Sequence, residues 1–359
     1  MRTATSRMQP DYSRQILLKD VGTSGQAVLA ASRVLIVGAG GLGSPVLQYL
    51  AGAGVGFLGL VEADVLQASN LHRQPIYELA QVGEPKAALA AAAVAKINPT
   101  VRVQIHPERF GADNALRLVQ AHDVVVDCTD NFRTKFLIND AAVLAERPAV
   151  FASVYQYEGQ LQVYEPLDSH ACLRCLWPEA TPDGIVGNCA EAGILGPVPG
   201  AFGALQALLT LKILLKMHGR LDGELLLMDF TTFTSTKLRA PRRRDCVAPR
   251  CALVRGLEPE DADIEIALSS LAEASPRFRL VDVRTPEEFA ANPSPARHIP
   301  MAALLADPGA LAAPSAPADP GAYLLICASG KRSLATAREL RKRGINAHSL
   351  VGGLQGLKH

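Results

Sequence analysis

Short apolar runs alternate with longer helical segments along the first 150 residues. The runs at 33–37, 57–61 and 124–130 are apolar over most of their length, as in strands that are buried on both faces. The stretches at 46–53 and 86–97 have the length and the alanine or leucine content of helices. This alternation predicts a doubly wound, Rossmann-like α/β sheet.

The pattern changes after residue 149. Residues 160–164 alternate apolar and polar side chains, and residues 225–237 contain further residues that favour strands. We expect these segments to add antiparallel strands to the same sheet, next to a parallel strand at 101–105 and a helix that starts near 131–134.

The last 95 or so residues begin a second α/β alternation. Strands are expected at 278–283 and 323–326, and a helix at 334–343. Thr285 and Glu288 have the spacing of a capping box, with a proline at the first helical position between them. The polar, proline-bearing stretch at 239–265 is typical of a domain boundary.

Length and charge narrow the class of protein. A chain of 359 residues is long enough for about two domains. We expect a larger domain at 1–245, a linker at 246–263 and a small α/β domain at 264–359. Lys and Arg number 36 against 35 Asp and Glu, a net charge of +1, which argues against a nucleic-acid partner bound through bulk positive charge.

Targeting signals give a further expectation. The first ten residues lack the apolar core of a secretory signal. The apolar stretch at 194–217 contains prolines, a glutamine and lysines, so we expect a buried helix and no membrane partner. These features predict a cytoplasmic protein.

A glycine turn follows the first strand. Gly38, Gly40 and Gly43 match the G-x-G-x-x-G pattern, and Glu62 stands 24 residues after the first glycine. The pattern predicts that phosphates bind at the start of the next helix, which Ser44 is expected to cap with Pro45 at its first position. The turn alone is compatible with a dinucleotide or with ATP.

The segments that follow resemble the MoeB/ThiF family, which is related to the ubiquitin-activating enzymes. The resemblance covers about residues 10–250 and is carried by Tyr12–Gln15, the glycine turn, Ser69–Gln74, Lys86 and Asp130–Asn131. It implies an adenylyltransferase that uses ATP and Mg²⁺ to activate the C-terminal glycine of a small ubiquitin-like sulfur carrier ending in Gly-Gly.

The resemblance also implies roles for single residues. Glu62 would bind the ribose, Asn70 would help to hold the phosphates, and Arg14 would reach in from the other subunit of a homodimer. Arg73, Lys86 and Arg14 would supply positive charge, and Asp130 an oxygen ligand for Mg²⁺. The predicted ATP-binding residues are Gly38, Gly40, Gly41, Gly43, Glu62, Asp64, Ser69, Asn70, Arg73, Lys86, Asp130 and Asn131.

The chain has seven cysteines, and four of them form two close pairs. Cys172 and Cys175 are spaced C-x-x-C, and Cys246 and Cys251 are spaced C-x₄-C, which predicts a structural Zn²⁺ site, with redox-active or unliganded thiols as the alternative. Cys189 lies where the family carries a cysteine that can bond covalently to the activated carrier. A small buried side chain is an equal interpretation of Cys189.

Cys327 begins a different motif, Cys-Ala-Ser-Gly-Lys-Arg-Ser, between a predicted strand and helix. Backbone N–H groups of such a loop can surround an anion, and the helix dipole together with Arg332 would favour the thiolate. With Asp282 and Arg284 upstream and His298 after the next helix, residues 264–359 resemble a single-domain rhodanese. Such a domain holds sulfur as a cysteine persulfide, which implies a persulfide sulfur donor as a second partner.

Together the two resemblances predict one polypeptide that adenylates a carrier and then converts it to a thiocarboxylate with sulfur from Cys327. Two alternatives remain open. A nicotinamide-dependent oxidoreductase would explain the glycine turn and Glu62 but gives no role to Arg73, Lys86 and Asp130. A non-catalytic scaffold that docks ubiquitin-like proteins would require both sites to be inactive.

Overall fold

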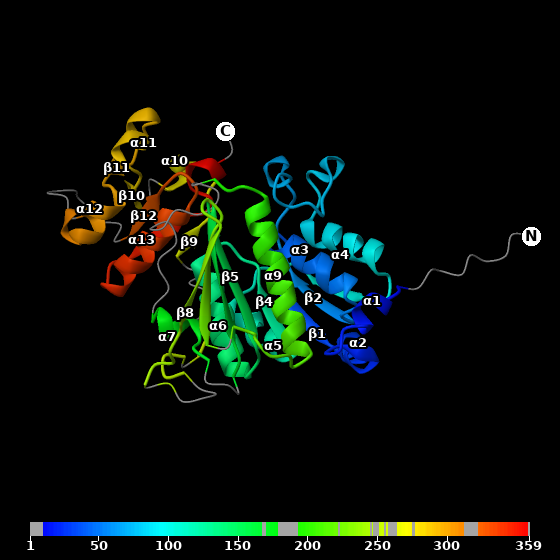
Figure 1. The fold of residues 1–359 in the computed structure, drawn as a ribbon. Coiled ribbons are helices and arrows are strands. Elements are labelled where there is room, and N and C mark those ends of the chain that lie inside the picture. Colours follow the sequence, from blue (N-terminus) through cyan, green and yellow to red (C-terminus); the bar gives the residue numbers. More distant parts are fainter. Residues whose placement is uncertain are drawn as a thin grey trace, which may run out of the picture. The chain divides into compact units, whose positions relative to one another are not determined.

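The computed structural model describes residues 10–166, 170–178, 193–221, 223–244, 246, 251–254, 256–257, 264–274, 277–311 and 322–357. These residues form two compact units, the first up to residue 257 and the second from residue 264 (Figure 1). Each unit has its own sheet and its own core, so each is described by itself.

The first unit is built on an eight-stranded sheet with the order β3-β2-β1-β4-β5-β6-β7-β8. The strands are β1 (Arg33–Val37), β2 (Phe57–Val61), β3 (Arg102–His106), β4 (Val124–Asp127), β5 (Ala149–Tyr155), β6 (Glu158–Tyr164), β7 (Glu224–Asp229) and β8 (Thr234–Arg239). The first five pair in parallel, and the last three continue the sheet with antiparallel pairs. The predicted mixed sheet is confirmed.

Helices cover both faces of this sheet (Figure 1). They are α1 (Ser13–Ile16), α2 (Gly22–Ala31), α3 (Gly43–Gly52), α4 (Lys86–Ile97), α5 (Ala112–Gln120), α6 (Phe132–Ala145), α7 (Leu173–Leu176) and α9 (Pro197–Leu214), with short 3₁₀ helices η1 (Ala68–Asn70) and η2 (Leu79–Gln81). Alternate residues of β1 face opposite cores: Ile36 packs in the cluster with α3, α4 and α9, and Leu35 in the cluster with α5 and α6. A strand buried on both faces needs a continuously apolar run, as the sequence has here.

Among the described helices, α9 has the length and hydropathy that would allow a membrane span. Half of its apolar window is buried inside the unit, and the polar side chains of Gln206 and Thr210 are completely buried there. Gln206 donates hydrogen bonds to the carbonyls of Asp127 and Val150, which ties α9 to β4 and β5.

The strand order reverses between β1 and β4, and the space at the carboxyl ends of these two strands is here called the crevice. The chain runs from β1 outward through β2 to β3, then returns to place β4 on the other side of β1. The loops after β1 and β4 therefore diverge, and ligands of doubly wound sheets bind in the space between such loops.

The predicted cap of the helix after β1 is wrong. Helix α3 begins at Gly43, because Leu42 already has helical dihedral angles (φ −76°, ψ −45°). Ser44 therefore lies within the first turn, and its hydroxyl donates to the carbonyl of Gly40 at 2.8 Å instead of capping.

The second unit is a five-stranded parallel sheet with the order β11-β10-β12-β13-β9. Its strands are β9 (Glu265–Ile266), β10 (Arg279–Asp282), β11 (Arg297–His298), β12 (Tyr323–Ile326) and β13 (Ala347–Leu350). Its helices are α10 (Leu271–Ala274), α11 (Pro286–Ala291), α12 (Met301–Ala306) and α13 (Lys331–Lys342), with 3₁₀ turns η3 (Pro308–Leu311) and η4 (Gly353–Gly356).

The sequence predicts the start of α11 correctly and the start of α13 three residues too late. The capping box before α11 is confirmed: the Thr285 hydroxyl accepts from the Glu288 N–H, and the Glu288 carboxylate accepts from the Thr285 N–H. Helix α13 starts three residues earlier than predicted, because Gly330 takes a left-handed conformation (φ +84°) and turns the chain directly into the helix.

Gly43→Ala should destabilise the first unit by about 3 kcal/mol, because a Cβ there would overlap the carbonyl oxygen of Gly38. Gly52→Ala, at the other end of the same helix, is the matched control: a Cβ there has no neighbour within 4 Å, and we expect up to about 1 kcal/mol of stabilisation. Urea unfolding followed by Trp177, the single tryptophan, measures both in this unit. Equal unfolding midpoints for the two variants would contradict the prediction.

Candidate active site

The glycine turn joins β1 to α3 at the crevice. Gly38 has φ +97°, a backbone conformation that residues other than glycine rarely adopt. A Cβ at this position would lie 2.8 Å from the Cys128 carbonyl oxygen. Gly40 is different, since a Cβ would meet only the Gln74 Nε2 atom at an ordinary 3.6 Å. Packing therefore does not require glycine at position 40, whereas close approach of a ligand to the backbone would.

The Glu62 carboxylate, at the end of β2, is fixed by two backbone donors. One oxygen accepts from the Ala39 N–H at 2.9 Å, and the other accepts from the Asp64 N–H at 2.8 Å. The acid is thereby held against the glycine turn, at the carboxyl edge of the sheet where a ribose would lie beside the phosphates.

Lys86 places a buried ammonium group near the same edge. The residue is only 5% exposed, and its Nζ lies 3.2 Å from the Asp64 carboxylate, whose side chain is 73% exposed. The Lys86 N–H also donates to the Asp64 carbonyl, which fixes the start of α4 to the loop after β2. A buried cation with a solvent-exposed partner can exchange that partner for a ligand anion at little cost in burial.

Ser69, Asn70 and Arg73 lie in and just after η1, and the contacts of Asn70 and Arg73 are local. The Asn70 side-chain oxygen accepts from the Gln67 N–H at 3.1 Å, and Arg73 donates to the Ser69 carbonyl at 2.8 Å. Arg73 also lies 2.9 Å from a ring nitrogen of His72.

The sequence interpretation missed two residues that join this segment to the glycine turn. The Tyr77 hydroxyl donates to the Ala39 carbonyl at 2.9 Å, and burial, with the nearby Glu62 and Asp64 carboxylates, raises the pKa of Tyr77. Gln74 is buried beside Gly40, and its side-chain oxygen has no hydrogen-bond partner in the described part of the chain. Tyr77 lies outside the motifs, and Gln74 ends the Ser69–Gln74 segment without a role that the sequence assigns, so the folded segment is needed to show what each contacts.

The loop after β4 holds Asp130 and Asn131. Asp130 is exposed, while the Asn131 side chain accepts from the Thr134 N–H at 2.8 Å and caps α6. Behind the loop, the completely buried Asp127 pairs with Lys135 and accepts hydrogen bonds from the N–H and the hydroxyl of Thr129. This buried ion pair fixes the backbone that presents Asp130.

Arg14 does not join these residues within its own chain. Gln15 donates to the carbonyl of Ala53 at 3.1 Å, so α1 is attached just beyond the end of α3 that is remote from the glycine turn. Since α3 has ten residues, this anchor lies about 15 Å from the turn. The exposed Arg14 side chain is too short to cover that distance.

The two cysteine pairs meet in the core of the first unit. The sulfurs of Cys172 and Cys175 are 3.9 Å apart, those of Cys246 and Cys251 are 3.2 Å apart, and those of Cys172, Cys175 and Cys251 lie within 4.8 Å of one another. A hydrogen bond from Cys172 lowers the pKa of Cys175 to about 5, which favours a thiolate. Cys189 lies outside the described residues.

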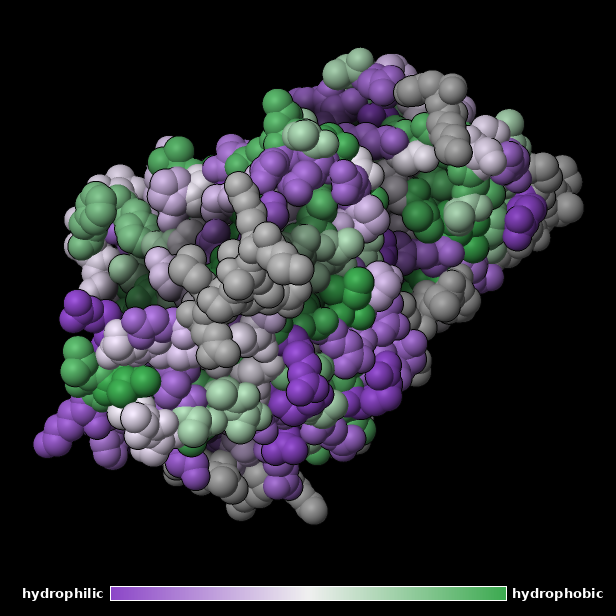
Figure 2. All heavy atoms as spheres, turned by 90° about the vertical axis from the view of Figure 1, so that its right-hand side faces the viewer, coloured by the Kyte–Doolittle hydropathy of each residue, from purple (hydrophilic) through white to green (hydrophobic). Residues whose placement is uncertain are grey.

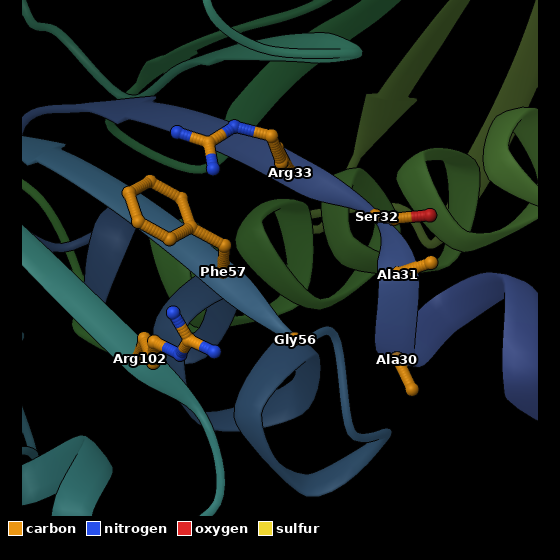
Figure 3. A pocket seen from close by; sticks show the side chains of 7 residues that line it. All are labelled: Ala30, Ala31, Ser32, Arg33, Gly56, Phe57 and Arg102. Atoms are coloured by element: carbon orange, nitrogen blue, oxygen red, sulfur yellow. The ribbon is translucent and has the colours of Figure 1, made fainter.

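A small cavity at the opposite edge of the sheet is a poor candidate for the nucleotide site (Figure 3). It encloses about 180 Å³, is lined by residues that include Arg33, Phe57 and Arg102, and lies where β1, β2 and β3 begin. Ligand sites for small organic molecules usually exceed about 300 Å³. The Arg33 guanidinium already stacks on the Phe57 ring, 3.7 Å from its centroid.

In the second unit, Cys327 directly follows β12 and is completely buried. Its sulfur accepts from the Ser333 N–H at 3.4 Å, at the start of α13, so the loop curls around the sulfur. The C-terminal turn η4 supports the loop from outside, because the N–H of Leu354 donates to the Cys327 carbonyl and the N–H of Gln355 to the Ala328 carbonyl. The arrangement suits a sulfur nucleophile that is held in one orientation.

Arg332 donates two hydrogen bonds, at 2.6 and 2.7 Å, to the Glu288 carboxylate of α11. Asp282 and Arg284 form a second ion pair at the end of β10, in which Asp282 is completely buried. The predicted influence of Arg332 on the Cys327 thiolate stays a prediction, because the guanidinium charge is balanced by Glu288.

The glycine crevice defines the first unit as a nucleotide-binding domain, and the enclosed thiol defines the second as a sulfurtransferase domain. The ThiF family matches residues 12–248 and the Rhodanese-like domain matches residues 267–359. The chain therefore belongs to the ThiF family and carries a rhodanese-like domain, which confirms both predicted resemblances.

Relatives of known name agree with this class. The chain is 46% identical to the sulfur carrier protein adenylyltransferase of Thermus thermophilus, over 70% of this chain and 93% of the relative. It is 36% identical to the adenylyltransferase and sulfurtransferase MOCS3 of Aedes aegypti, over 97% of this chain and 86% of the relative. The chain is thus an enzyme of the adenylyltransferase and sulfurtransferase class, as predicted, and the oxidoreductase alternative is wrong.

Solved structures resemble this chain in fold. The crystal structure of E. coli MccB aligns with a TM-score of 0.59 at 22% identity, over 69% of this chain and 73% of that one.

Acid should weaken the second unit through Glu288. The Arg332 guanidinium lowers the pKa of this carboxyl from 4.5 to about 2, so the pair contributes stability above about pH 4.5 and loses it as the pH falls toward 2. The carboxylate is 39% exposed, and solvent screening limits the expected contribution to about 1 kcal/mol. Trp177 reports on the first unit, so the unfolding of the second unit by urea is followed by circular dichroism. Its unfolding free energy should depend less on pH in Glu288→Gln than in the wild type. An identical dependence in both proteins would disprove this role.

Proposed function

We propose that the chain adenylates the C-terminal glycine of a ubiquitin-like sulfur carrier and then transfers sulfur from a Cys327 persulfide to form a thiocarboxylate. The observation that carries the proposal is the pairing, in one chain, of a glycine turn flanked by Glu62 and Lys86 with an enclosed thiol at Cys327. The names of the relatives support a sulfur carrier as the protein substrate. The carrier would be of the molybdopterin-synthase small-subunit or the thiamine-pathway type.

The first step needs positive charge more than it needs a base. A terminal carboxylate is ionised at neutral pH, so its oxygen can attack the α-phosphorus of ATP while the bond to pyrophosphate breaks. Two anions about 4 Å apart repel by ~4 kcal/mol at an effective dielectric constant near 20. Lys86 and Arg73 would offset this repulsion on the phosphates, with the turn at Gly38–Gly43 supplying backbone donors.

Asp130 would hold Mg²⁺ at the mouth of the crevice. Its exposed carboxylate is a hard oxygen donor, and the buried Asp127–Lys135 pair fixes the loop that presents it. When bound, Mg²⁺ neutralises charge on the pyrophosphate leaving group.

The second step joins the two units chemically. The terminal sulfur of the Cys327 persulfide attacks the carrier carbonyl, AMP leaves, and the carrier is bound to Cys327 through an acyl disulfide. Attack by a second thiolate, for which we propose Cys189, on the Cys327 sulfur releases the thiocarboxylate and leaves a disulfide. Formation of a carrier thioester at Cys189 is the alternative route. A persulfide donor reloads Cys327 once the disulfide is reduced by a thiol.

The four clustered cysteines fit a structural Zn²⁺ site. Four thiolates about 2.3 Å from a tetrahedral ion lie about 3.8 Å apart, close to the 3.9 Å between Cys172 and Cys175. Cys246 and Cys251 would complete the set from the segment that follows β8. When bound, Zn²⁺ would link the segment that carries Cys246 and Cys251 to the loop before α7. It has no proposed part in adenylation or sulfur transfer.

Arg14 supports a homodimer, because α1 is anchored too far from the glycine turn of its own chain. We propose that each Arg14 completes the crevice of the other copy. This enzyme would work in the cytoplasm.

ATP–pyrophosphate exchange tests the first step. We expect exchange that requires a carrier with its last glycine, a loss of at least about 100-fold in Asp130→Asn, and wild-type exchange in Cys327→Ala, which forms no thiocarboxylate. Exchange that does not depend on any carrier would disprove the substrate class. Loss of exchange in Cys327→Ala would disprove the division of labour, and wild-type thiocarboxylate formation in that variant would favour the scaffold alternative.

Subunit complementation tests the role of Arg14. Arg14→Ala and Asp130→Asn should each be inactive, but co-refolded together they should recover about a quarter of wild-type exchange, since about half the dimers are mixed and each mixed dimer has one intact site. An inactive mixture that nevertheless contains mixed dimers, shown by two affinity tags, would place Arg14 in its own chain's site.

A further inference from the structure

Two buried hydroxyl groups lie beside the sulfur of Cys327. The Ser333 hydroxyl, in the first turn of α13, is 3.4 Å from the Cys327 sulfur. The Ser349 hydroxyl, on strand β13 between β12 and β9, is 2.8 Å from the Ser333 hydroxyl. Both serines are completely buried. Ser349 does not belong to the loop motif, and its neighbours in sequence give no sign of a role.

Counting protons shows what Ser349 can do. The Ser333 hydroxyl has one proton and three neighbours: the Cys327 sulfur, the Ser349 hydroxyl, and the Gly330 carbonyl at 3.0 Å, which can only accept. If the sulfur is a thiolate, Ser333 can donate to it only by turning its proton away from Gly330. The contact between the two hydroxyls then needs the Ser349 proton, because two oxygens 2.8 Å apart with no proton between them repel.

The Ser349 hydroxyl is well placed to supply that proton. Its backbone is fixed in the sheet, with its N–H donating to the Ile264 carbonyl at 2.7 Å and its register opposite Leu325 of β12. Its other acceptor in reach, the Gly330 carbonyl, is 3.3 Å away and already accepts from the Leu334 N–H. The shorter contact to Ser333 is therefore the favoured one.

We propose that Ser349 is a positioning residue for sulfur loading: its hydroxyl donates to Ser333, which in turn donates to the Cys327 thiolate. The hydrogen-bond chain does not depend on the proposed function; the loading of Cys327 with sulfur, which the chain would assist, does. In that reaction the thiolate attacks the outer sulfur of a persulfide R–S–SH, the S–S bond of the donor breaks, and R–S⁻ leaves with the electron pair and takes up a proton as Cys327 keeps the sulfur. A chain of two hydroxyl donors stabilises the attacking anion more than one isolated donor does.

The test is the rate at which iodoacetamide alkylates Cys327 in the full chain, followed by mass spectrometry of the peptide that contains it. Ser333→Ala should slow alkylation about tenfold and Ser349→Ala about fivefold. In the Ser333→Ala background, Ser349→Ala should change the rate less than about 1.5-fold, because its path to the sulfur is already broken. Ser349→Thr, which keeps the hydroxyl, should stay within about twofold of wild type.

Thr336→Val is the matched control. Thr336 is a completely buried hydroxyl residue of the same unit whose side chain donates to the Arg332 carbonyl, and its loss should leave the rate unchanged. If Ser349→Ala does not fold, shown by its thermal transition, Ser349→Cys replaces it in the same double-mutant test. Equal slowing by the Ser349 variant in both backgrounds would overturn the proposal, as would a wild-type rate in Ser349→Ala.

Alkylation requires no carrier, ATP or persulfide, so its outcome is independent of the proposed function. Loading with a small-molecule persulfide, followed on the same peptide, should show the same order of rates. If the alkylation results hold and no thiocarboxylate ever forms, the proposed function fails and the role of Ser349 stands.

Discussion

The first unit depends on how tightly one backbone turn can be packed. Gly43 touches the carbonyl of Gly38, and this contact leaves no room for a side chain where β1 turns into α3. Ala39, inside the turn, is held on both sides: its N–H donates to Glu62 and its carbonyl accepts from Tyr77. Segments 23 and 38 residues further along the chain therefore both bond to Ala39 and fix the backbone of the turn.

The second unit has a similar glycine-containing turn between a parallel strand and a helix. In both units a parallel strand ends, a glycine takes a left-handed conformation, and a helix begins within a few residues. In the second unit the N–H of Ser333, in the first turn of that helix, contacts the sulfur of Cys327. In the first unit the Ser44 N–H already donates to the Gly40 carbonyl and Pro45 has no N–H, so the turn before α3 is what can offer backbone donors to phosphates. Figure 2 shows that hydrophilic and hydrophobic residues are mixed over the face it displays.

Most of the fold could be predicted from the sequence, because buried parallel strands have distinctive apolar runs. Strands β2 and β12 and helix α4 have the predicted limits. Helix starts were harder, since dihedral angles at Leu42 and Gly330 decide them and neither angle has a sequence signature.

Some residues of the candidate site could be predicted from sequence motifs, and others are identified only by the structure. Residues within motifs, such as Glu62 and Lys86, could be selected because the motif fixes their spacing. Tyr77 and Ser349 lie outside the motifs and could not be selected, because their importance comes from contacts that only the tertiary structure creates. Gln74 ends the Ser69–Gln74 segment, but its place beside Gly40 likewise appears only in the structure. The pairing of Arg332 with Glu288 likewise depends on α11 lying near α13, which no local pattern indicates.

The fusion of the two units follows from the reactivity of the proposed intermediate. An acyl adenylate is an activated ester that water can attack, so a sulfur nucleophile that must arrive by diffusion competes with hydrolysis. A thiol on the same chain has an effective concentration that is set by the linker and not by the concentration of the protein in solution. For short flexible linkers this effective concentration is in the millimolar range. The acyl adenylate therefore favours a nucleophile carried on the same chain, and the sulfur of Cys327, held by the Ser333 N–H and lying beside the Ser333 hydroxyl, is fixed in orientation for that role.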